Sequence, residues 1–286
     1  MADLPPPHGP ALPLRQAGPD GDVAGGGASP RAGTIPRIAR EEGLSGFTAG
    51  DFLAVMEAVT MILTLPQSAA AHVDALVVAT GQGEEWRLRH AIRHWEAHPQ
   101  LRHLLIANGN PAERTYVEIT LDQLRGLGLR RTDGVRLQAE PATDTGRQAA
   151  WIADRVAALG ITGLALTVSP YHLARVYLTV LKAFIGSGIR VPLIPLPVAV
   201  PPDTPVPETG ATAYDLVPGE VQRILTYQER GWVATPAELR QYLHWLWSRH
   251  PALLDASAPG RPEGTTSTGS TGPPATASGS AGPPPA

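Results

Sequence analysis

Four polar residues in one short stretch, Ser169, Tyr171, His172 and Arg175, have types and spacing that could do chemistry. His172 and Arg175 lie three positions apart, so a helix beginning near Ser169 would place both on one face of its first turns. Anions are favoured at that end of a helix, and basic side chains beside free backbone N–H groups suit a phosphate or carboxylate ligand. His172 could also transfer a proton, because an unperturbed histidine has a pKa of about 6.5.

Ser169 also has a purely structural interpretation. A hydroxyl cap followed by Pro170 at the first helical position is a typical helix start, so we interpret Ser169 chiefly as a cap that could also touch a ligand. A Ser-His pair at a helix start lacks the strained Gly-x-Ser-x-Gly turn of the hydrolases, which disfavours Ser169 as a nucleophile.

Other polar turns follow the apolar runs that we interpret as strands. Residues 74–80 lead into Gly81-Gln82-Gly83, residues 103–107 lead into Asn108-Gly109-Asn110, and a polar segment opens at Glu140. In open parallel sheets ligands bind beyond the carboxyl ends of the strands, so we expect these turns to form one cleft. Within the polar segment, Asp144 or Thr145 could instead cap a helix. The candidate ligand-binding residues are Gly81, Gln82, Gly83, Arg87, Asn108, Gly109, Glu140, Asp144, Thr145, Gln148, Ser169, Tyr171 and Arg175, with His172 as the candidate catalytic residue.

The elements that must position these residues alternate along the chain. We expect strands at 74–80, 103–107, 135–137, 164–168 and 191–196, separated by helices at 84–98, 112–127, 145–159 and 171–184. This alternation predicts an α/β fold, a Rossmann-like, doubly wound, mainly parallel five-stranded sheet with helices on both faces.

Three further helices flank the predicted sheet. Thr48 or Asp51 could cap the first, whose apolar stripe is Phe52, Val55, Met56, Val59 and Leu63. Two more are expected at 218–230 and 236–250, the second with Thr235 as cap and Pro236 at its first position. The proline-rich loop 198–214 between sheet and helices would be a lid, a linker or disordered.

The ends of the chain are rich in Gly and Pro, which number 30 each among 286 residues. Such composition cannot bury enough apolar surface to offset the entropy of ordering, so disordered segments are expected at 1–45 and 251–286. The remaining domain, 46–250, would comprise a core at 70–200 and a helical appendage at 216–250.

Composition narrows the class of protein. A formal net charge of −3 gives no general attraction to nucleic acid or anionic membranes, and the absence of cysteine excludes disulfides and thiolate chemistry. The start of the chain does not have the pattern of a secretory signal. The most apolar stretch, 52–65, is interrupted by Glu57 and is too short to span a bilayer. We therefore expect a cytoplasmic protein with a small-molecule ligand and no nucleic-acid partner.

Two patterns are weaker. Gly81-Gln82-Gly83 lacks the third glycine of the dinucleotide fingerprint, which disfavours NAD. His90, His94 and His98 are spaced four apart but lack the glutamate of the zinc-protease motif, so we interpret them as a solvated helix face and expect no metal.

Over residues 74–197 the order of these motifs resembles the bacterial YdcF/SanA/ElyC family. Segment 168–175 reads Val-Ser-Pro-Tyr-His-Leu-Ala-Arg, close to the family's Thr-Ser-x-Tyr-His-x-x-Arg. Gly81, Gly83 and Arg87 are similar to the family's first turn, and Asn108-Gly109-Asn110 is similar to its second. Glu140 and Thr145 match the middle motif. The chain departs from the middle motif at three positions. Asp144 and Gln148 stand where the family usually has Asn, and Arg147 stands where it often has Glu.

The resemblance implies a Rossmann-like sheet with a ligand site at its strand ends, and Tyr171 is a candidate through it alone. One cytoplasmic branch of the family is associated with S-adenosylmethionine, while membrane-anchored branches are linked to cell-envelope and lipid-carrier metabolism. Our leading hypothesis is a protein that binds an anionic or nucleotide-like small molecule. A non-catalytic adaptor or regulator in envelope metabolism and a phosphate-ester or pyrophosphate hydrolase are the alternatives.

Overall fold

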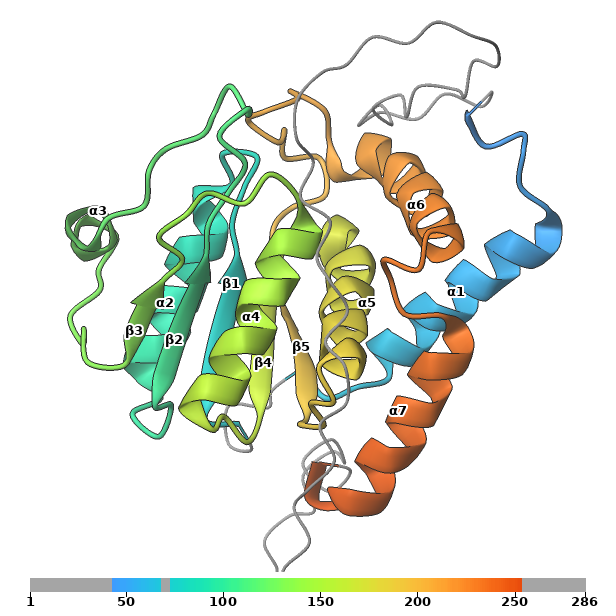
Figure 1. Ribbon diagram of the computed structural model, residues 1–286. Helices are drawn as coiled ribbons and strands as arrows, with labels where there is room; N and C mark the ends of the chain where they lie inside the picture. Colours follow the sequence, from blue (N-terminus) through green and yellow to red (C-terminus); the bar gives the residue numbers. More distant parts are fainter. Residues whose placement is uncertain (1–42, 68–72, 254–286) are drawn as a thin grey trace, which may run out of the picture. The chain divides into compact units, whose positions relative to one another are not determined.

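A single parallel sheet forms the centre of the computed structural model, which describes residues 43–67 and 73–253 (Figure 1). Its strand order is β3-β2-β1-β4-β5. The strands are β1 (Ala75–Ala79), β2 (His103–Ala107), β3 (Val135–Leu137), β4 (Leu164–Val168) and β5 (Leu193–Pro197). Because the order reverses between β1 and β4, the crevice beyond their carboxyl ends is where such a fold binds ligands.

The central strands are buried on both faces, as their almost entirely apolar sequences predict. Every residue of β1 and β4 is buried, and the two strands pair in register from Ala75 with Leu164 to Val78 with Thr167. Helix α2 (Glu85–Ala97) covers one face, while α4 (Thr145–Leu159) and α5 (Pro170–Gly186) cover the other (Figure 1). The predicted five-stranded Rossmann-like α/β fold is confirmed.

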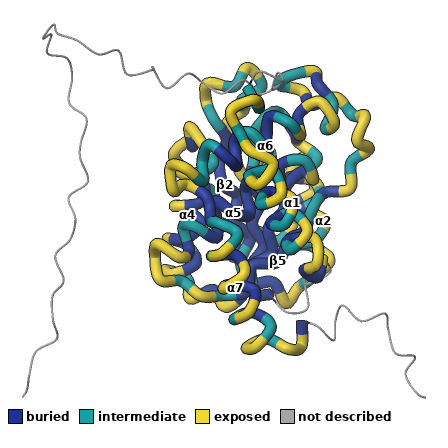
Figure 2. Tube along the Cα trace, turned by 90° about the vertical axis from the view of Figure 1, so that its right-hand side faces the viewer, coloured by how far each residue is buried: buried dark blue, intermediate teal, exposed yellow. Residues whose placement is uncertain are grey.

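A further layer of helices packs outside α5. It consists of α1 (Ala49–Leu63), α6 (Ala213–Glu229) and α7 (Pro236–Arg249). Helix α1 contacts α5, α6 and α7, α6 also packs on α5, and Lys182 of α5 pairs with Glu238 of α7. Helix α5 is therefore enclosed from two sides, and Figure 2 shows it as a largely buried element. Thr48 caps α1 and Thr235 caps α7, both in reciprocal capping boxes, as expected.

The predicted apolar stripe of α1 is partly wrong. The buried residues are Val55, Ala58 and Ile62, whereas Met56 and Leu63 are exposed. Val55, Ala58 and Ile62 recur at the same helical spacing as the predicted residues, so the spacing alone does not show which face is buried. The buried face is the one that packs on α5, α6 and α7, which are distant in sequence.

Two predicted helices have different bounds in the structure. Residues 111–120 form turns and coil, so the helix expected at 112–127 is reduced to α3 (Leu121–Gly126), which Thr120 caps. Helix α6 begins five residues before the expected 218, because Thr212 and Asp215 form a capping box. Pro218 thus lies inside the helix, where it lacks the N–H that would reach the carbonyl of Tyr214.

The disordered segments expected at 1–45 and 251–286 lie mostly outside the described residues, and only 43–45 and 251–253 are placed. Leu253 is buried against the core. No helix within 43–67 or 73–253 is long and apolar enough to cross a membrane.

Candidate functional site

The turn after β1 has a strained backbone. Gly81, Gln82 and Gly83 have φ angles of 135°, 59° and 69°, and Gln82 is the one non-glycine residue with positive φ in the described ranges. A Cβ on Gly83 would lie 2.8 Å from the Cβ of Thr115, so glycine is also required by close packing. Glycine at positions 81 and 83 thus permits both the positive φ angles and the close approach of Thr115.

Two carboxylate-bearing residues hold this turn in place. The N–H of Gln82 donates to Glu113 Oε2 at 2.5 Å, and the carbonyl of Gln82 accepts from the N–H of Glu208 at 3.2 Å. Glu208 in turn accepts from the N–H and the hydroxyl of Thr115, at 2.9 and 2.7 Å. Three segments that are distant in sequence therefore meet at the turn.

Ser169 occupies the N-cap position of α5, but its side chain does not cap the helix. Its hydroxyl donates to Glu84 Oε1 at 2.8 Å and accepts from Nε of Arg87 and Nε1 of Trp86, both at 3.1 Å. The interpretation of the hydroxyl as a helix cap is therefore wrong. Ser169 instead joins the start of α5 to the start of α2.

Arg87 and Glu84 form a buried ion pair on the first turn of α2, with side chains 1 % exposed. Arg87 also donates to the carbonyl of Ala79 at 3.0 Å, at the end of β1. The hydroxyl of Tyr171 donates to Glu84 Oε2 at 3.1 Å. These contacts bring together two predicted segments, the one around Arg87 and the one from Ser169 to Tyr171.

Arg175 and His172 contact a carboxylate that the sequence analysis missed, that of Glu220 on α6. Arg175 Nε donates to Glu220 Oε2 at 2.6 Å, and His172 Nδ1 lies 2.9 Å from the same oxygen. Arg223 Nη1 donates to Glu220 Oε1 at 3.3 Å. All four side chains are buried. The carboxylate of Glu220 thus occupies the place beside His172 and Arg175 where the sequence analysis expected an anionic ligand.

The charges in this cluster determine the protonation of its members. Burial by itself favours a neutral Glu220, but the positive charge of Arg175 and the hydrogen bonds from Arg175 and His172 hold its pKa well below the usual range. Burial, reinforced by the charge of Arg175, lowers the pKa of His172 to about 3. His172 is therefore neutral at neutral pH and donates Nδ1–H to Glu220, which disfavours the expected acid–base role.

The turn after β2 is fixed by side-chain amides. The N–H of Asn108 donates to Gln138 Oε1 at 3.1 Å. Gln148 Nε2 donates to the carbonyls of Asn108 and Thr80, at 2.7 and 3.0 Å, and so joins the ends of β2 and β1. A Cβ on Gly109 would lie 3.4 Å from Cα of Gly81, so the two glycine turns pass close to each other. Gln148 and Asn108 therefore hold together the two strand ends at which the cleft lies.

The crossover before α4 contributes less than expected. Asp144 caps α4 by accepting from the N–H of Arg147 at 2.9 Å, which confirms its structural interpretation. Thr145 accepts from Arg175 Nη1 at 2.9 Å and so belongs to the Glu220 cluster. Glu140 is exposed to solvent and does not line the pocket described next.

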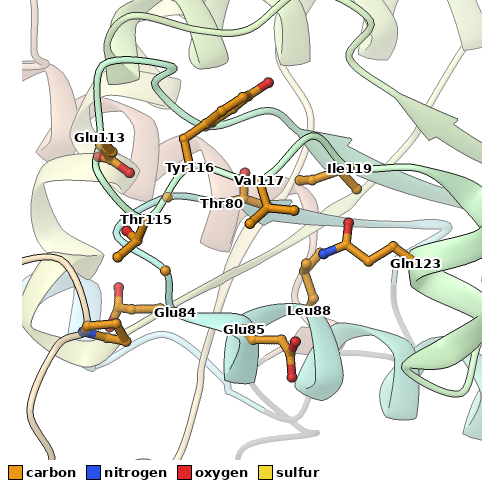
Figure 3. Close-up of a pocket in the computed structure, with 14 residues that line it drawn as sticks. Thr80, Glu84, Glu85, Leu88, Glu113, Thr115, Tyr116, Val117, Ile119 and Gln123 are labelled. Atoms are coloured by element: carbon orange, nitrogen blue, oxygen red, sulfur yellow. The ribbon is translucent and has the colours of Figure 1, made fainter.

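A pocket of about 220 Å³ opens at the carboxyl ends of β1 and β2 (Figure 3). Glu84, Glu85 and Leu88 approach it from the start of α2, and the coil after β2 closes the opposite side. The lining residues are Thr80, Gly81, Gly83, Glu84, Glu85, Leu88, Gly109, Glu113, Thr115, Tyr116, Val117, Ile119, Gln123 and Pro207. Of the predicted site residues, only the three glycines line this pocket. Most of the others hold the surrounding turns or belong to the Glu220 cluster, whereas Asp144 only caps α4 and Glu140 is exposed to solvent.

The proline-rich loop between β5 and α6 forms part of the pocket wall. Pro207 lines the pocket, and the carbonyls of Pro207 and Glu208 accept from Arg114 Nη2 at 3.1 and 3.0 Å. Val206 is buried and belongs to a small apolar cluster against which Tyr171 packs. The loop therefore has the position of a lid, one of the three roles considered for it.

The three histidines of α2 lie outside this site. The rings of His90 and His94 are tilted by 51° with centroids 4.5 Å apart, and those of His94 and His98 are stacked with centroids 5.5 Å apart. In the part of the chain that the structure describes, no three His, Cys, Asp or Glu side chains gather in a way that could hold a metal ion.

Comparison with known proteins gives only distant likenesses, all of them among solved structures. No protein-family model and no curated protein matches the chain. Among solved structures, the chain is similar to the Bordetella bronchiseptica enzyme WbmG in complex with NAD, at 16 % sequence identity and a TM-score of 0.27. The match covers 55 % of this chain and spans about half, 50 %, of the WbmG chain.

Proposed function

We propose that this protein binds a nucleoside-type small molecule in the pocket at the ends of β1 and β2, with S-adenosylmethionine as the specific candidate. The observation that carries the proposal is the pocket itself, which combines apolar side chains with an amide and several carboxylates. Its volume of about 220 Å³ lies slightly below the usual range for ligand sites, about 300–1,000 Å³, and suits a nucleoside better than a dinucleotide.

The apolar side chains of the pocket suit a flat heterocycle. Leu88 comes from α2 on one side, and Tyr116 and Ile119 come from the coil after β2 on the opposite side. Gln123 lies beside them, and its Oε1 is buried without a hydrogen-bond partner among the described residues. Leaving a buried acceptor unsatisfied costs about 1–3 kcal/mol, so a base with an amino group would gain by donating to it.

The carboxylates suit the rest of such a ligand. Glu84, Glu85 and Glu113 line the pocket, and none of the lining residues, all within the described part of the chain, is Lys, Arg or His. Carboxylates accept hydrogen bonds from ribose hydroxyls and attract cationic groups. S-adenosylmethionine has both features and would bring a transferable methyl group on its sulfonium. The lining residues therefore fit the ribose, ammonium and sulfonium groups of this cofactor, whereas its carboxylate would have to lie away from them.

The proposal changes the roles of the residues first singled out. Arg175 and His172 hold Glu220 and so tie α5 to α6, which carries the end of the lid. Ser169 and Arg87 fix Glu84 at the pocket rim. All are positioning residues in this account, and the proposal assigns binding without a reaction.

We also propose that the chain is a member of the YdcF/SanA/ElyC family. The two motifs that carry the resemblance, Gly81-Gln82-Gly83 with Arg87 and the segment 168–175, contact each other through the hydrogen bond from Arg87 to Ser169. Motifs 82 residues apart that meet in one hydrogen-bond network support a shared site.

Titration calorimetry with S-adenosylmethionine and adenosine tests the proposed function. Ile119→Trp should fill the pocket and weaken binding at least about tenfold, because overpacking a site forces its neighbours aside. Leu121→Trp is the matched control, since Leu121 lies two residues away, is 38 % exposed and does not line the pocket. If the wild type binds neither compound, or if both variants bind as the wild type does, the proposal is wrong.

A further inference from the structure

Gln123 is held at the edge of the pocket by a short, anchored helix. It lies on α3, which Thr120 caps by accepting the backbone N–H of Gln123 at 3.2 Å. The next residue, Leu124, is fully buried in the core and so fixes how the helix is turned about its axis. The side chain of Gln123 therefore has a defined direction, and it lines the pocket.

The amide of Gln123 carries an acceptor that the protein leaves unused. Figure 3 shows Gln123 and Ile119 at one end of the pocket and Glu113 and Thr115 at the other. Gln123 Oε1 is buried without a hydrogen-bond partner among the described residues. The side chains of Ile119 and Leu88, which also line the pocket, have no donor to offer it. A molecule that enters the pocket can therefore satisfy this oxygen.

A single acceptor among apolar side chains distinguishes ligands by one hydrogen-bond donor. Adenine is a flat ring whose exocyclic amino group is such a donor, and glutamine recognises adenine through this group where proteins read bases. A base without the amino group would leave Oε1 of Gln123 unsatisfied. Sites that are built to hydrogen-bond a ligand group reject the analogue that lacks it for this reason.

We propose that Gln123 is the specificity-determining residue of the pocket, and that its Oε1 selects 6-aminopurine nucleosides over those that lack the amino group. The inference rests on the proposed function, because it names the base that the same pocket accepts. It also assigns the orientation of the ligand, with the base at the α3 end and the ribose toward Glu113 and Thr115.

Adenosine and purine riboside are suitable probes, because purine riboside lacks only the 6-amino group. In calorimetry on the full chain, we expect the wild type to bind adenosine at least about fivefold more tightly. Inosine has a carbonyl oxygen in place of the amino group and should bind no more tightly than purine riboside. Gln123→Met keeps an unbranched side chain without the amide, so the preference for adenosine should fall to about twofold or less.

Arg125→Met is the matched control, because Arg125 is exposed on the same helix, does not line the pocket and receives the same side chain. It should keep the wild-type preference. Gln123→Glu retains an acceptor at the same position and should keep the preference as well. If Gln123→Met binds neither probe, Gln123→Glu decides, because loss of the preference in a variant that keeps the acceptor overturns the assignment.

Three other results overturn the assignment of Gln123 while leaving nucleoside binding intact. They are equal binding of adenosine and purine riboside by the wild type, tighter binding of inosine than of adenosine, and an unchanged preference in Gln123→Met. Failure of the wild type to bind any of the three nucleosides overturns the proposed function and this inference with it.

Discussion

Replacing Glu220 by glutamine should destabilise the domain more than any conservative change on its surface. The carboxylate is buried and accepts from Arg175 at 2.6 Å, from His172 at 2.9 Å and from Arg223 at 3.3 Å. The substitution removes the negative charge and leaves these basic groups in place. Removing one partner of a buried ion pair costs about 3–5 kcal/mol, because the remaining charge stays desolvated.

Urea unfolding followed by circular dichroism measures this loss. For a domain of this size, about 3–5 kcal/mol corresponds to a fall in Tm of about 6–20 °C. Glu229→Gln is the matched control, since Glu229 lies on the same helix and is exposed. It should change the free energy of unfolding by less than about 0.5 kcal/mol.

The difference between the wild type and Glu220→Gln should also depend on pH. Because the pKa of folded Glu220 is depressed, its stabilising effect is complete above the unfolded value of about 4.3 and is lost as the pH falls below it. A difference smaller than about 1 kcal/mol at pH 7 would refute the conclusion that Glu220 is the anion held by Arg175.

Three further predictions follow from the described contacts. His172, with its pKa lowered to about 3, should make the wild type lose up to about 1.4 kcal/mol per pH unit as the pH falls from about 6.5; His172→Gln should reduce this slope in urea titrations, and an unchanged slope would contradict a buried, neutral His172. Ser169→Ala should cost about 1–3 kcal/mol in urea unfolding, because three side-chain partners lose a hydrogen bond; a loss below about 0.5 kcal/mol would contradict that network. Gly134→Ala should cost more than about 3 kcal/mol, because φ is +83° and a Cβ would overlap a carbonyl oxygen, whereas Gly186→Ala, in open space, should be neutral or slightly stabilising by thermal unfolding.

The parallel sheet could be predicted from the sequence because its signal is local. The runs that became β1, β2 and β4 are apolar except for His103 and Thr167, and such runs are typical of strands buried on both faces. The start of α6 was missed because Pro218 resembled a first helical position. The capping pair Thr212 and Asp215 was the local signal that places it correctly.

The coil 111–120 could not be predicted, because its conformation depends on distant partners. Thr115 and Arg114 bond to Glu208, more than 90 residues later, and Glu113 bonds to the turn at Gln82. Neither helical periodicity nor a turn motif in residues 111–120 indicates these contacts with distant parts of the chain.

The candidate site was predicted in location but not in detail. The turns at Gly81 and Gly109 meet at the strand ends as expected, since the fold determines that edge. Glu220 was missed because a glutamate in an amphipathic helix normally faces solvent. Its spacing of four residues from both Leu216 and Ile224 indicates the buried face and was the available signal.

Methyl NMR of isoleucine-labelled protein tests the location of the ligand most directly. Ile119 lines the pocket, and Ile185 is 42 % exposed at the end of α5 and does not line it. Titration with S-adenosylmethionine or adenosine should shift the Ile119 methyl resonance and leave that of Ile185 in place. An unshifted Ile119 at saturating ligand would contradict the account.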